Sequence, residues 1–223
     1  MTRKISILGS TGSIGVNTLN VIDTLKEEFD VVYLSTFQNS KLIIDQAKKY
    51  QPKAIVIVDD SNAKNVKNAL EKDNIEIFSG REGLLEISKR DDIDLVMNGL
   101  VGSAGMEPTL NALKASVDVA LSNKESMVMA GDLINKTMNE TRAKIYPVDS
   151  EHSAIWQCLV GENIKDVNRI ILTGSGGPFR TRDVKTFPKI KLTEALNHPN
   201  WSMGKKITID SATMMNKGLE VIE

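Results

Sequence analysis

The sequence predicts an α/β protein built on a doubly wound parallel sheet, and two observations carry this prediction. Short β-branched or apolar runs alternate with longer stretches of helical period through the first 146 residues. Strands that alternate with helices are joined by right-handed crossovers, so the strands run parallel and helices cover both faces. In addition, a glycine-rich segment follows the first apolar run directly, where the first crossover begins.

Each expected element has its own pattern. Strands are expected where apolar and β-branched residues are concentrated, at Lys4–Leu8, Val31–Ser35, Ala54–Val58, Asp94–Met97, Val117–Leu121 and Lys144–Pro147. Helices are expected where apolar residues recur at intervals of three and four, at Ile14–Glu27, Lys41–Lys49, Ala63–Leu70, Pro108–Ala115 and Met127–Arg142. After Pro147 the sequence becomes richer in polar loops, and a last helix is expected over Ala212–Glu223, without a C-cap signal.

The composition excludes several classes of protein. Hydrophobic residues make up 41% and charged residues 26% of the 223 residues, which is typical of a packed globular chain. The net charge of -1 gives no reason to expect nucleic acid or an anionic membrane as a partner. No apolar run approaches the roughly 20 residues of a membrane span, and no signal segment precedes the first strand. A single cysteine, Cys158, fits a reducing compartment, so a cytoplasmic protein is expected.

The glycine-rich segment has the spacing G-x-x-G-x-x-G, a variant of the Rossmann dinucleotide fingerprint. It comprises Gly9, Ser10, Thr11, Gly12, Ser13, Ile14 and Gly15. Small residues permit a tight turn and let the backbone approach a pyrophosphate, while the helix N-terminus presents free N–H groups to it. The alternative is an ordinary glycine-rich connection between a strand and a helix. A second glycine-rich turn, Asn98–Gly105, either borders the nicotinamide side of the cofactor or is only a tight connection.

The end of the second strand indicates which cofactor is bound. An NAD enzyme usually carries an acid there, which holds the 2′-hydroxyl of the ribose. Residues 34–41 contain no acid, and they offer hydroxyls, amides and Lys41 instead. NADP is therefore favoured over NAD, although these residues could also be solvated loop residues.

Several carboxylates lie in positions typical of a cation site. Asp149 and Glu151 come directly after an expected strand, and in extended chain residues two apart point to the same side. Glu220 and Glu223 share one face of the expected last helix. Acids without paired histidine or cysteine suit Mg²⁺ or Mn²⁺ rather than zinc. For each acid taken alone, a solvated surface charge remains the alternative.

Other polar residues could bind an anionic substrate. Lys124 follows an expected strand at the sheet edge that also carries the glycine-rich turns. Donors suited to a phosphate group are Ser175, Ser211, Asn216 and Lys217. The segment His198–Gly204 is expected to be a loop with a polar tip and an aromatic lid, although Trp201 could belong to the core and His198 could be a cap.

Five sequence segments, taken in their order along the chain, connect these patterns with one protein family. They are Gly9–Gly15, Asn123–Ser126, Pro147–His152, Leu172–Arg180 and His198–Glu223. Together they closely resemble the 1-deoxy-D-xylulose 5-phosphate reductoisomerase family over essentially the whole chain. The segment Asp210–Glu220 is the most specific of the matching stretches. The chain departs from the family at Phe37-Gln38, where members commonly have a small and then a basic residue.

The resemblance implies a role for each site residue. It implies a divalent-metal site of Asp149, Glu151 and Glu220, with Glu223 as a supporting acid, and it adds Lys124 to these three ligands as a catalytic residue. Substrate contacts are implied for Lys124, Ser150, Glu151, Ser175, His198, Ser211, Asn216, Lys217 and Glu220. NADPH contacts are implied for Gly9, Ser10, Thr11, Gly12, Ser13, Ile14, Gly15, Asn39, Asn123, Glu125 and Gly204. A mobile flap over the substrate is implied for His198, Trp201 and Met203.

The resemblance also implies domains and a reaction. Residues 1–147 would bind NADPH, and residues 148–223 would form an α/β catalytic domain that is incomplete at its C-terminal end. With Mg²⁺ or Mn²⁺, the full-length homodimer would rearrange and reduce 1-deoxy-D-xylulose 5-phosphate in isoprenoid precursor synthesis. One alternative is another NADP-dependent dehydrogenase, such as one acting on a semialdehyde, but lone Cys158 supplies no catalytic context for it. A second alternative is a dinucleotide-binding module without turnover.

Overall fold

The computed structural model describes residues 2–25, 27–201 and 203–223. Within it the chain forms two units, Met1–Asp149 and Ser150–Glu223. The division lies two residues after the boundary expected at Pro147. That the units are a cofactor-binding and a catalytic domain stays a prediction. Among the described residues, no helix is long and apolar enough to span a membrane.

The first unit contains a seven-stranded sheet in which all neighbouring strands run parallel. Its strands are β1 (Arg3–Leu8), β2 (Phe29–Thr36), β3 (Ala54–Ile57), β4 (Glu76–Ser79), β5 (Leu95–Asn98), β6 (Asp118–Leu121) and β7 (Ile145–Pro147). The spatial order is β4-β3-β2-β1-β5-β6-β7, so the chain winds outward from β1 in one direction and then returns to wind in the other. The predicted doubly wound α/β fold is confirmed, and the change of direction falls between β1 and β5.

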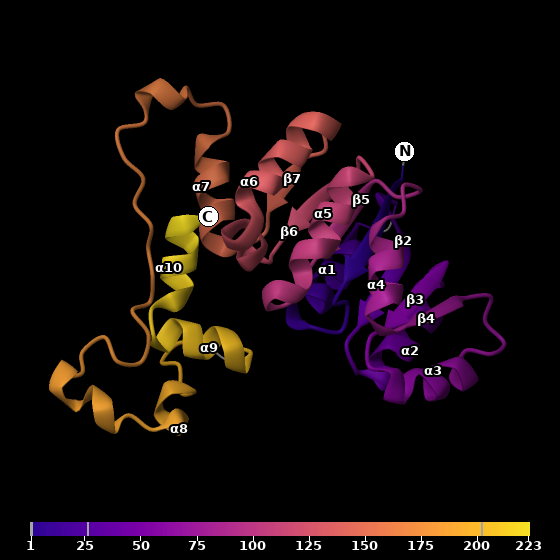
Figure 1. Ribbon diagram of the computed structural model, residues 1–223, viewed down its shortest axis with the longest axis horizontal. Helices are drawn as coiled ribbons and strands as arrows, with labels where there is room; N and C mark the ends of the chain where they lie inside the picture. The colour runs from indigo at the N-terminus through magenta and orange to yellow at the C-terminus, as the bar shows by residue number, and fades with distance from the viewer. Residues whose placement is uncertain (1, 26, 202) are drawn as a thin grey trace. The chain divides into compact units, whose positions relative to one another are not determined.

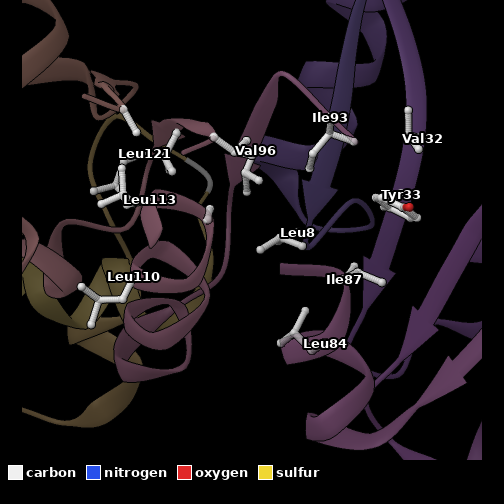
Figure 2. Close-up of a cluster of buried hydrophobic side chains, with 14 of the residues drawn as sticks. Leu8, Val32, Tyr33, Leu84, Ile87, Ile93, Val96, Leu110, Leu113 and Leu121 are labelled. Atoms are coloured by element: carbon white, nitrogen blue, oxygen red, sulfur yellow. The ribbon is translucent and has the colours of Figure 1, made fainter. Parts of the chain in front are cut away.

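Helices cover both faces of this sheet (Figure 1). They are α1 (Ser13–Thr24), α2 (Ser40–Tyr50), α3 (Ala63–Ala69), α4 (Gly80–Ser88), α5 (Met106–Lys114) and α6 (Lys124–Thr141). Side chains alternate along each strand, so Ile5 and Ile7 of β1 join α1, α2 and α3 in one apolar cluster. Leu8 points to the opposite face and packs in a second cluster with residues of α4, α5 and α6. Figure 2 shows Leu8 together with the residues of α4 and α5 in this cluster.

Two elements of this unit were not predicted. Strand β4 contains only two apolar residues, Ile77 and Phe78, and none of its residues is buried, because it lies at the edge of the sheet. Helix α4 begins at Gly80, a residue that is unfavourable inside a helix, and this hides the short apolar stripe of Leu84 and Ile87. Local pattern is weakest where an element is short and half-exposed.

In the first unit, two expected helix boundaries differ from the structure by three residues each. Helix α1 ends at Thr24 rather than Glu27, and Lys26 lies outside the described residues. Helix α6 begins at Lys124, three residues before the expected start, because the side chain of Asn123 caps it. Lys124 is therefore the first residue of a helix, and it does not lie in a loop.

The second unit contains helices and long loops. The helices are α7 (Ser150–Leu159), α8 (Leu192–Ala195), α9 (Lys205–Ala212) and α10 (Met215–Ile222). No strand is assigned within residues 150–201 and 203–223, so an α/β catalytic domain stays a prediction. The expectation that Glu151 lies in extended chain is wrong, because it falls in the first turn of α7. A single helix over Ala212–Glu223 is also wrong, because Met214 adopts a positive φ of 62° and separates α9 from α10.

Candidate functional site

The first glycine-rich turn is built by close backbone packing. Gly9 has a φ of 82°, and a Cβ atom added at Gly15 would lie 2.4 Å from the carbonyl oxygen of Gly9. No side chain fits at Gly15, so the turn must keep its small residues. Gly12 is the N-cap of α1, no side chain caps this helix end, and its first turn contains no acid. The backbone N–H groups at this end can therefore receive an anion such as a pyrophosphate.

Two hydroxyl residues of the turn have structural contacts. Ser10 is fully buried, and its Oγ donates to Oε1 of Gln46 at 2.7 Å, while Nε2 of Gln46 donates to the Ser10 carbonyl at 2.9 Å. Thr11 Oγ1 lies 2.6 Å from Thr36 Oγ1 at the end of β2. The side chain of Ser10 thus anchors the turn to α2, and its expected cofactor contact would have to come from its backbone. Gln46 was missed, although a glutamine between Ile43 and Ala47 in the apolar stripe of α2 was a usable signal.

The second glycine-rich turn lies directly against the first. A Cβ atom at Gly9 would come 3.2 Å from the carbonyl oxygen of Gly99, so the two turns lie side by side at the carboxyl ends of β1 and β5. Asn123 lies behind this second turn and donates through Nδ2 to the carbonyls of Leu100 and Gly102, both at 2.8 Å. Its Oδ1 accepts from the backbone N–H of Ser126 at 2.9 Å, which caps α6. The buried Asn123 side chain therefore holds the turn in place, while Glu125 lies in the first turn of α6.

The loop after β2 carries the residues expected to choose the cofactor. Asn39 is the N-cap of α2, and its Oδ1 accepts from the backbone N–H of Leu42 at 3.1 Å. Phe37 is 66% exposed, so its ring is available to contact a ligand. The first turn of α2 contains no acid, and nothing there repels a phosphate group.

Lys124 and Asp149 form an ion pair in the first unit. Lys124 Nζ lies 2.9 Å from Asp149 Oδ2, and the two side chains are only 7% and 15% exposed. An ammonium enclosed in this way needs its carboxylate partner, because an unpaired charge is costly to bury. The predicted catalytic lysine is thus held at the start of α6, and Asp149 follows β7.

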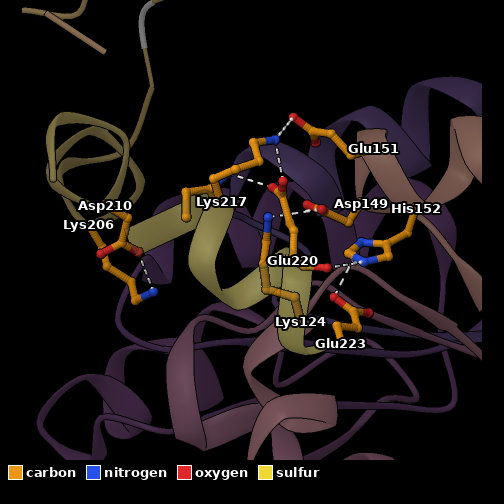
Figure 3. Close-up of polar contacts among 10 residues, drawn as sticks. Lys124, Asp149, Glu151, His152, Lys206, Asp210, Lys217, Glu220 and Glu223 are labelled. Carbon is orange, nitrogen blue, oxygen red and sulfur yellow. Dashed lines mark hydrogen bonds and ion pairs between the residues drawn. The ribbon is translucent and has the colours of Figure 1, made fainter. Parts of the chain in front are cut away.

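A second lysine joins two carboxylates in the second unit (Figure 3). Lys217 Nζ donates to Glu151 Oε1 at 2.9 Å and also to Glu220 Oε2. The Glu220 side chain is fully enclosed, and its Oε1 accepts from Asn216 Nδ2 at 2.5 Å. Burial by itself lowers the pKa of Lys217, but its hydrogen bonds to Glu220 and Glu151 outweigh burial and raise the pKa above its ordinary value. Helix α10 thus brings an ammonium to the acid of α7.

These carboxylates have the composition of a hard cation site. Oxygens of Glu151 and Glu220 lie within 4.8 Å of each other, a spacing that one ion can bridge. Asp149 precedes Glu151 by two residues, so the chain itself keeps a third carboxylate within reach. Carboxylate oxygens without sulfur or paired imidazole ligands suit Mg²⁺ or Mn²⁺. A buried carboxylate such as Glu220 needs a cation, and the residues present fit a divalent one.

His152 connects α7 to the end of α10. Its Nε2 lies 3.2 Å from the carbonyl oxygen of Glu220, and its Nδ1 lies 3.3 Å from Oε2 of Glu223. Glu223 therefore contacts an imidazole, whereas the sequence suggested a supporting acid beside the metal. His152 was not among the predicted site residues, since a lone histidine on a helix carries no spacing signal.

Ser175, one of the expected phosphate-binding residues, contacts His198 in the second unit. His198 Nδ1 accepts from the backbone N–H groups of Asn200 at 3.2 Å and Trp201 at 3.0 Å. Its proton therefore lies on Nε2, which donates to Ser175 Oγ at 3.1 Å and leaves the serine O–H to donate elsewhere. A Cβ atom at Gly177 would lie 2.5 Å from the carbonyl oxygen of Ser211, so the Ser175 loop packs on the end of α9.

The remaining predicted residues have simple positions. Ser150 is the first residue of α7, and Gly204 is the N-cap of α9. Trp201 is 65% exposed, Met203 is partly buried, and Ser202, between them, lies outside the described residues. Open space surrounds the position of a Cβ atom at Gly204. The expected contact of Gly204 with NADPH stays a prediction.

Comparison with known sequences gives two family models that together span most of the chain. The model described as 1-deoxy-D-xylulose 5-phosphate reductoisomerase matches residues 5–131, and the model of the C-terminal domain of that enzyme matches residues 145–223. A relative of the same name from Chloroherpeton thalassium is 56% identical over 221 residues, and one from Bacteroides fragilis is 47% identical. The match covers 99% of this chain and 57% of each relative.

Solved structures show the same similarity. A crystal structure of DOX-P reductoisomerase in complex with NADPH, fosmidomycin and magnesium matches with a TM-score of 0.90 and 39% identity. The enzyme from Zymomonas mobilis in complex with NADPH also matches with a TM-score of 0.90, at 41% identity. Each match covers nearly all of this chain and 57% of the solved chain, so the sequence spans somewhat more than half the length of its relatives.

Proposed function

The chain belongs to the 1-deoxy-D-xylulose 5-phosphate reductoisomerase family, and on that premise we propose that it serves the reaction for which the family is named. In this reaction 1-deoxy-D-xylulose 5-phosphate rearranges to a branched aldehyde, which NADPH reduces to 2-C-methyl-D-erythritol 4-phosphate, an isoprenoid precursor. The observation that carries the proposal is the enclosed carboxylate of Glu220, which shares a lysine with Glu151. Burial of a charged carboxylate costs free energy, and such an arrangement is typical of a functional site.

NADPH is the proposed reductant, and the two glycine-rich turns form its proposed site. The uncapped N-terminus of α1 can hold the pyrophosphate through Ser13, Ile14 and Gly15, and the turns lie where the sheet changes direction. The loop after β2 and the first turn of α2 offer Asn39 and Lys41, and no carboxylate, to the 2′-phosphate. Two solved relatives are complexes with NADPH, which supports the choice.

Asp149, Glu151 and Glu220 are the proposed ligands of Mg²⁺ or Mn²⁺. When bound, the divalent ion would acidify the substrate hydroxyl and polarise the neighbouring carbonyl. A solved relative that contains magnesium supports the choice of ion. The Lys124 ammonium, held by Asp149, could then orient the substrate oxygens, and Lys217 would be released from Glu220 and Glu151 to pair with phosphate.

The Ser175 loop is the proposed phosphate site, and it would work with Ser211, Asn216 and Lys217. His198 Nε2 donates to Ser175 Oγ, so the serine hydroxyl is free to donate its own proton to a phosphate oxygen. His198 is also bonded to the backbone of Trp201, and a phosphate held by Ser175 would therefore steady the proposed flap. Closure of the flap would exclude water from the reacting groups. Ser150, at the start of α7, is the remaining proposed substrate contact.

The non-catalytic alternative also has an observation in its favour. None of the described hydrophobic residues of the second unit is buried, so catalytic geometry on this unit lacks a rigid support of its own. Homodimer formation by the whole protein and a cytoplasmic location are further proposals, which rest on the family resemblance and on the single cysteine.

The test is the loss of NADPH absorbance with 1-deoxy-D-xylulose 5-phosphate and Mg²⁺ or Mn²⁺. Metal-dependent loss that Glu220→Gln abolishes, with NADPH affinity unchanged, supports both the reaction and the metal site. Glu162→Gln, at an exposed acid of the same unit, is the matched control and should keep full turnover. NADPH binding without turnover in the unaltered chain would favour the non-catalytic module. Unchanged turnover in Glu220→Gln would overturn the metal assignment.

A further inference from the structure

The second glycine-rich turn is held by side chains that reach it from three directions. Asn98, at the end of β5, donates to the carbonyl of Gly105 at 2.9 Å, and its Oδ1 accepts from the backbone N–H of Leu100 at 3.1 Å. Asn123 holds the carbonyls of Leu100 and Gly102 from α6. Both asparagines are buried, so these bonds exchange little with water.

The third direction is supplied by Arg81. Its guanidinium NH1 donates to the carbonyl of Ala104 at 2.7 Å, and NH2 lies 3.1 Å from Oε2 of Glu107 in the first turn of α5. One planar fork therefore joins the 3₁₀ turn Gly102–Gly105 to the start of α5. The Ala104 carbonyl thus accepts a side-chain hydrogen bond from α4, the helix that the sequence did not predict.

The place of Arg81 in its own helix is unfavourable. It is the second residue of α4, and a cation in the first turn of a helix opposes the partial positive charge there. The helix gains nothing from an arginine at this position, whereas the turn gains a charge-assisted bond. Its contacts beyond α4 account for its position.

We propose that Arg81 is a positioning residue of the dinucleotide site, which holds the second glycine-rich turn against the nicotinamide half of the cofactor. This inference rests on the proposed NADPH site, since the second turn contacts the first through Gly99. Arg81 contacts the second glycine-rich turn and the start of α5, and its bonds lie on the α4 and α5 side of that turn. Loss of the fork would loosen the nicotinamide side and leave the adenosine side unchanged.

The test compares Arg81→Met with Arg90→Met. Arg90 is a matched control, because its ion pair with Glu86 lies beside the same helix and the arginine side chains are each 38% exposed. In Arg81→Met, amide hydrogen exchange over residues 99–107 should become about tenfold faster, the ratio expected for one lost charge-assisted bond. The affinity for NADPH should fall by a similar factor, while the affinity for adenosine 2′,5′-bisphosphate, which lacks the nicotinamide half, stays unchanged.

The outcomes separate the inference from the proposed function. Unchanged exchange over 99–107 in Arg81→Met, or an equal change in Arg90→Met, would overturn the role of Arg81. Equal losses of affinity for NADPH and the bisphosphate would also overturn it, because they would show general damage. Faster exchange together with an unaltered chain that binds neither nucleotide would support the bracing contact and reject the proposed cofactor site.

Discussion

The two units of this chain are stabilised in different ways. Every buried hydrophobic residue that the structure describes lies between Ile5 and Ala143, in the first unit. In the described residues of the second unit, the buried positions are Gly177, Thr208 and Glu220. The first unit therefore has a core of its own, whereas the second is held mainly by hydrogen bonds and ion pairs.

This difference indicates which parts of the candidate site are rigid. The proposed cofactor site is formed by turns that are fixed to a packed sheet, so its shape follows from the fold. Glu151 and Glu220 depend on Lys217, Asn216 and each other, and a polar network stays ordered only while every member is paired. A divalent ion could replace the lysine between the acids and would then contribute to the order of the whole unit.

The largest expected effect is a difference in the rate at which a protease cleaves the two units. Trypsin should cleave first within residues 160–205, where Arg169 and Lys185 are exposed outside the α-helices, and leave a fragment that ends at Lys165, the first lysine or arginine after the first unit. Because cleavage requires local opening, the first unit should survive at least about a hundredfold longer. Mass spectrometry of timed digests would show it, and simultaneous loss of both units would contradict the comparison. Removal of divalent ions by a chelator should speed cleavage of the second unit only.

A pair of leucines tests the same difference in stability. Leu113 is fully buried, so Leu113→Ala should lower the free energy of unfolding by about 2–5 kcal/mol. Leu192 is 67% exposed, and Leu192→Ala should change it by less than about 0.5 kcal/mol. Urea unfolding followed by circular dichroism measures the first unit, while fluorescence of Trp156 and Trp201 reports the second. Comparable losses in the two variants would mean that Leu192 is buried in solution.

A pair of glycines tests the first turn. Gly15→Ala places a methyl group against backbone atoms, so we expect a loss of about 1–3 kcal/mol and weak NADPH binding. Gly131→Ala in α6 meets open space and should stabilise the unit by about 0.5–1 kcal/mol. Thermal unfolding and nucleotide titration measure both quantities. A fully stable Gly15→Ala that binds NADPH normally would show that the turn can move.

The smallest expected effect separates two buried serines of the first unit. Ser10 Oγ bonds to Gln46. Ser10→Ala should lower the free energy of unfolding by about 1–2 kcal/mol, because the buried Gln46 amide would lose its partner. Ser6 is equally buried, and in the described part of the chain its Oγ has no partner. Ser6→Ala should therefore be neutral or stabilising by up to about 1 kcal/mol. Chemical unfolding measures the free energy of unfolding of both variants. A lower value for Ser6→Ala would point to a bound water.

Much of the fold could be predicted from local pattern. The strands from β1 to β3 and from β5 to β7 carry enough apolar and β-branched residues to be recognised one by one. Strand β4 and helix α4 could not be, because the edge of the sheet buries too little of them. Because α4 was not predicted, the contact of its Arg81 with the second glycine-rich turn was not predicted either. The roles implied by resemblance, such as that of Gly204, stay predictions.

The sequence by itself determined the sheet, its crossovers and the glycine turn, because periodicity and the need for small residues are properties of neighbouring positions. Only the tertiary structure decided which charges meet. Glu151 and Lys217 are 66 residues apart, and Ser175 and His198 are 23 apart. No local signal encodes such pairs, because their contact depends on how helices and loops close over long stretches of chain. The tertiary structure also makes the side chains of Asn123 and Ser10 internal supports of the two glycine-rich turns, and their expected contacts with the cofactor stay predictions.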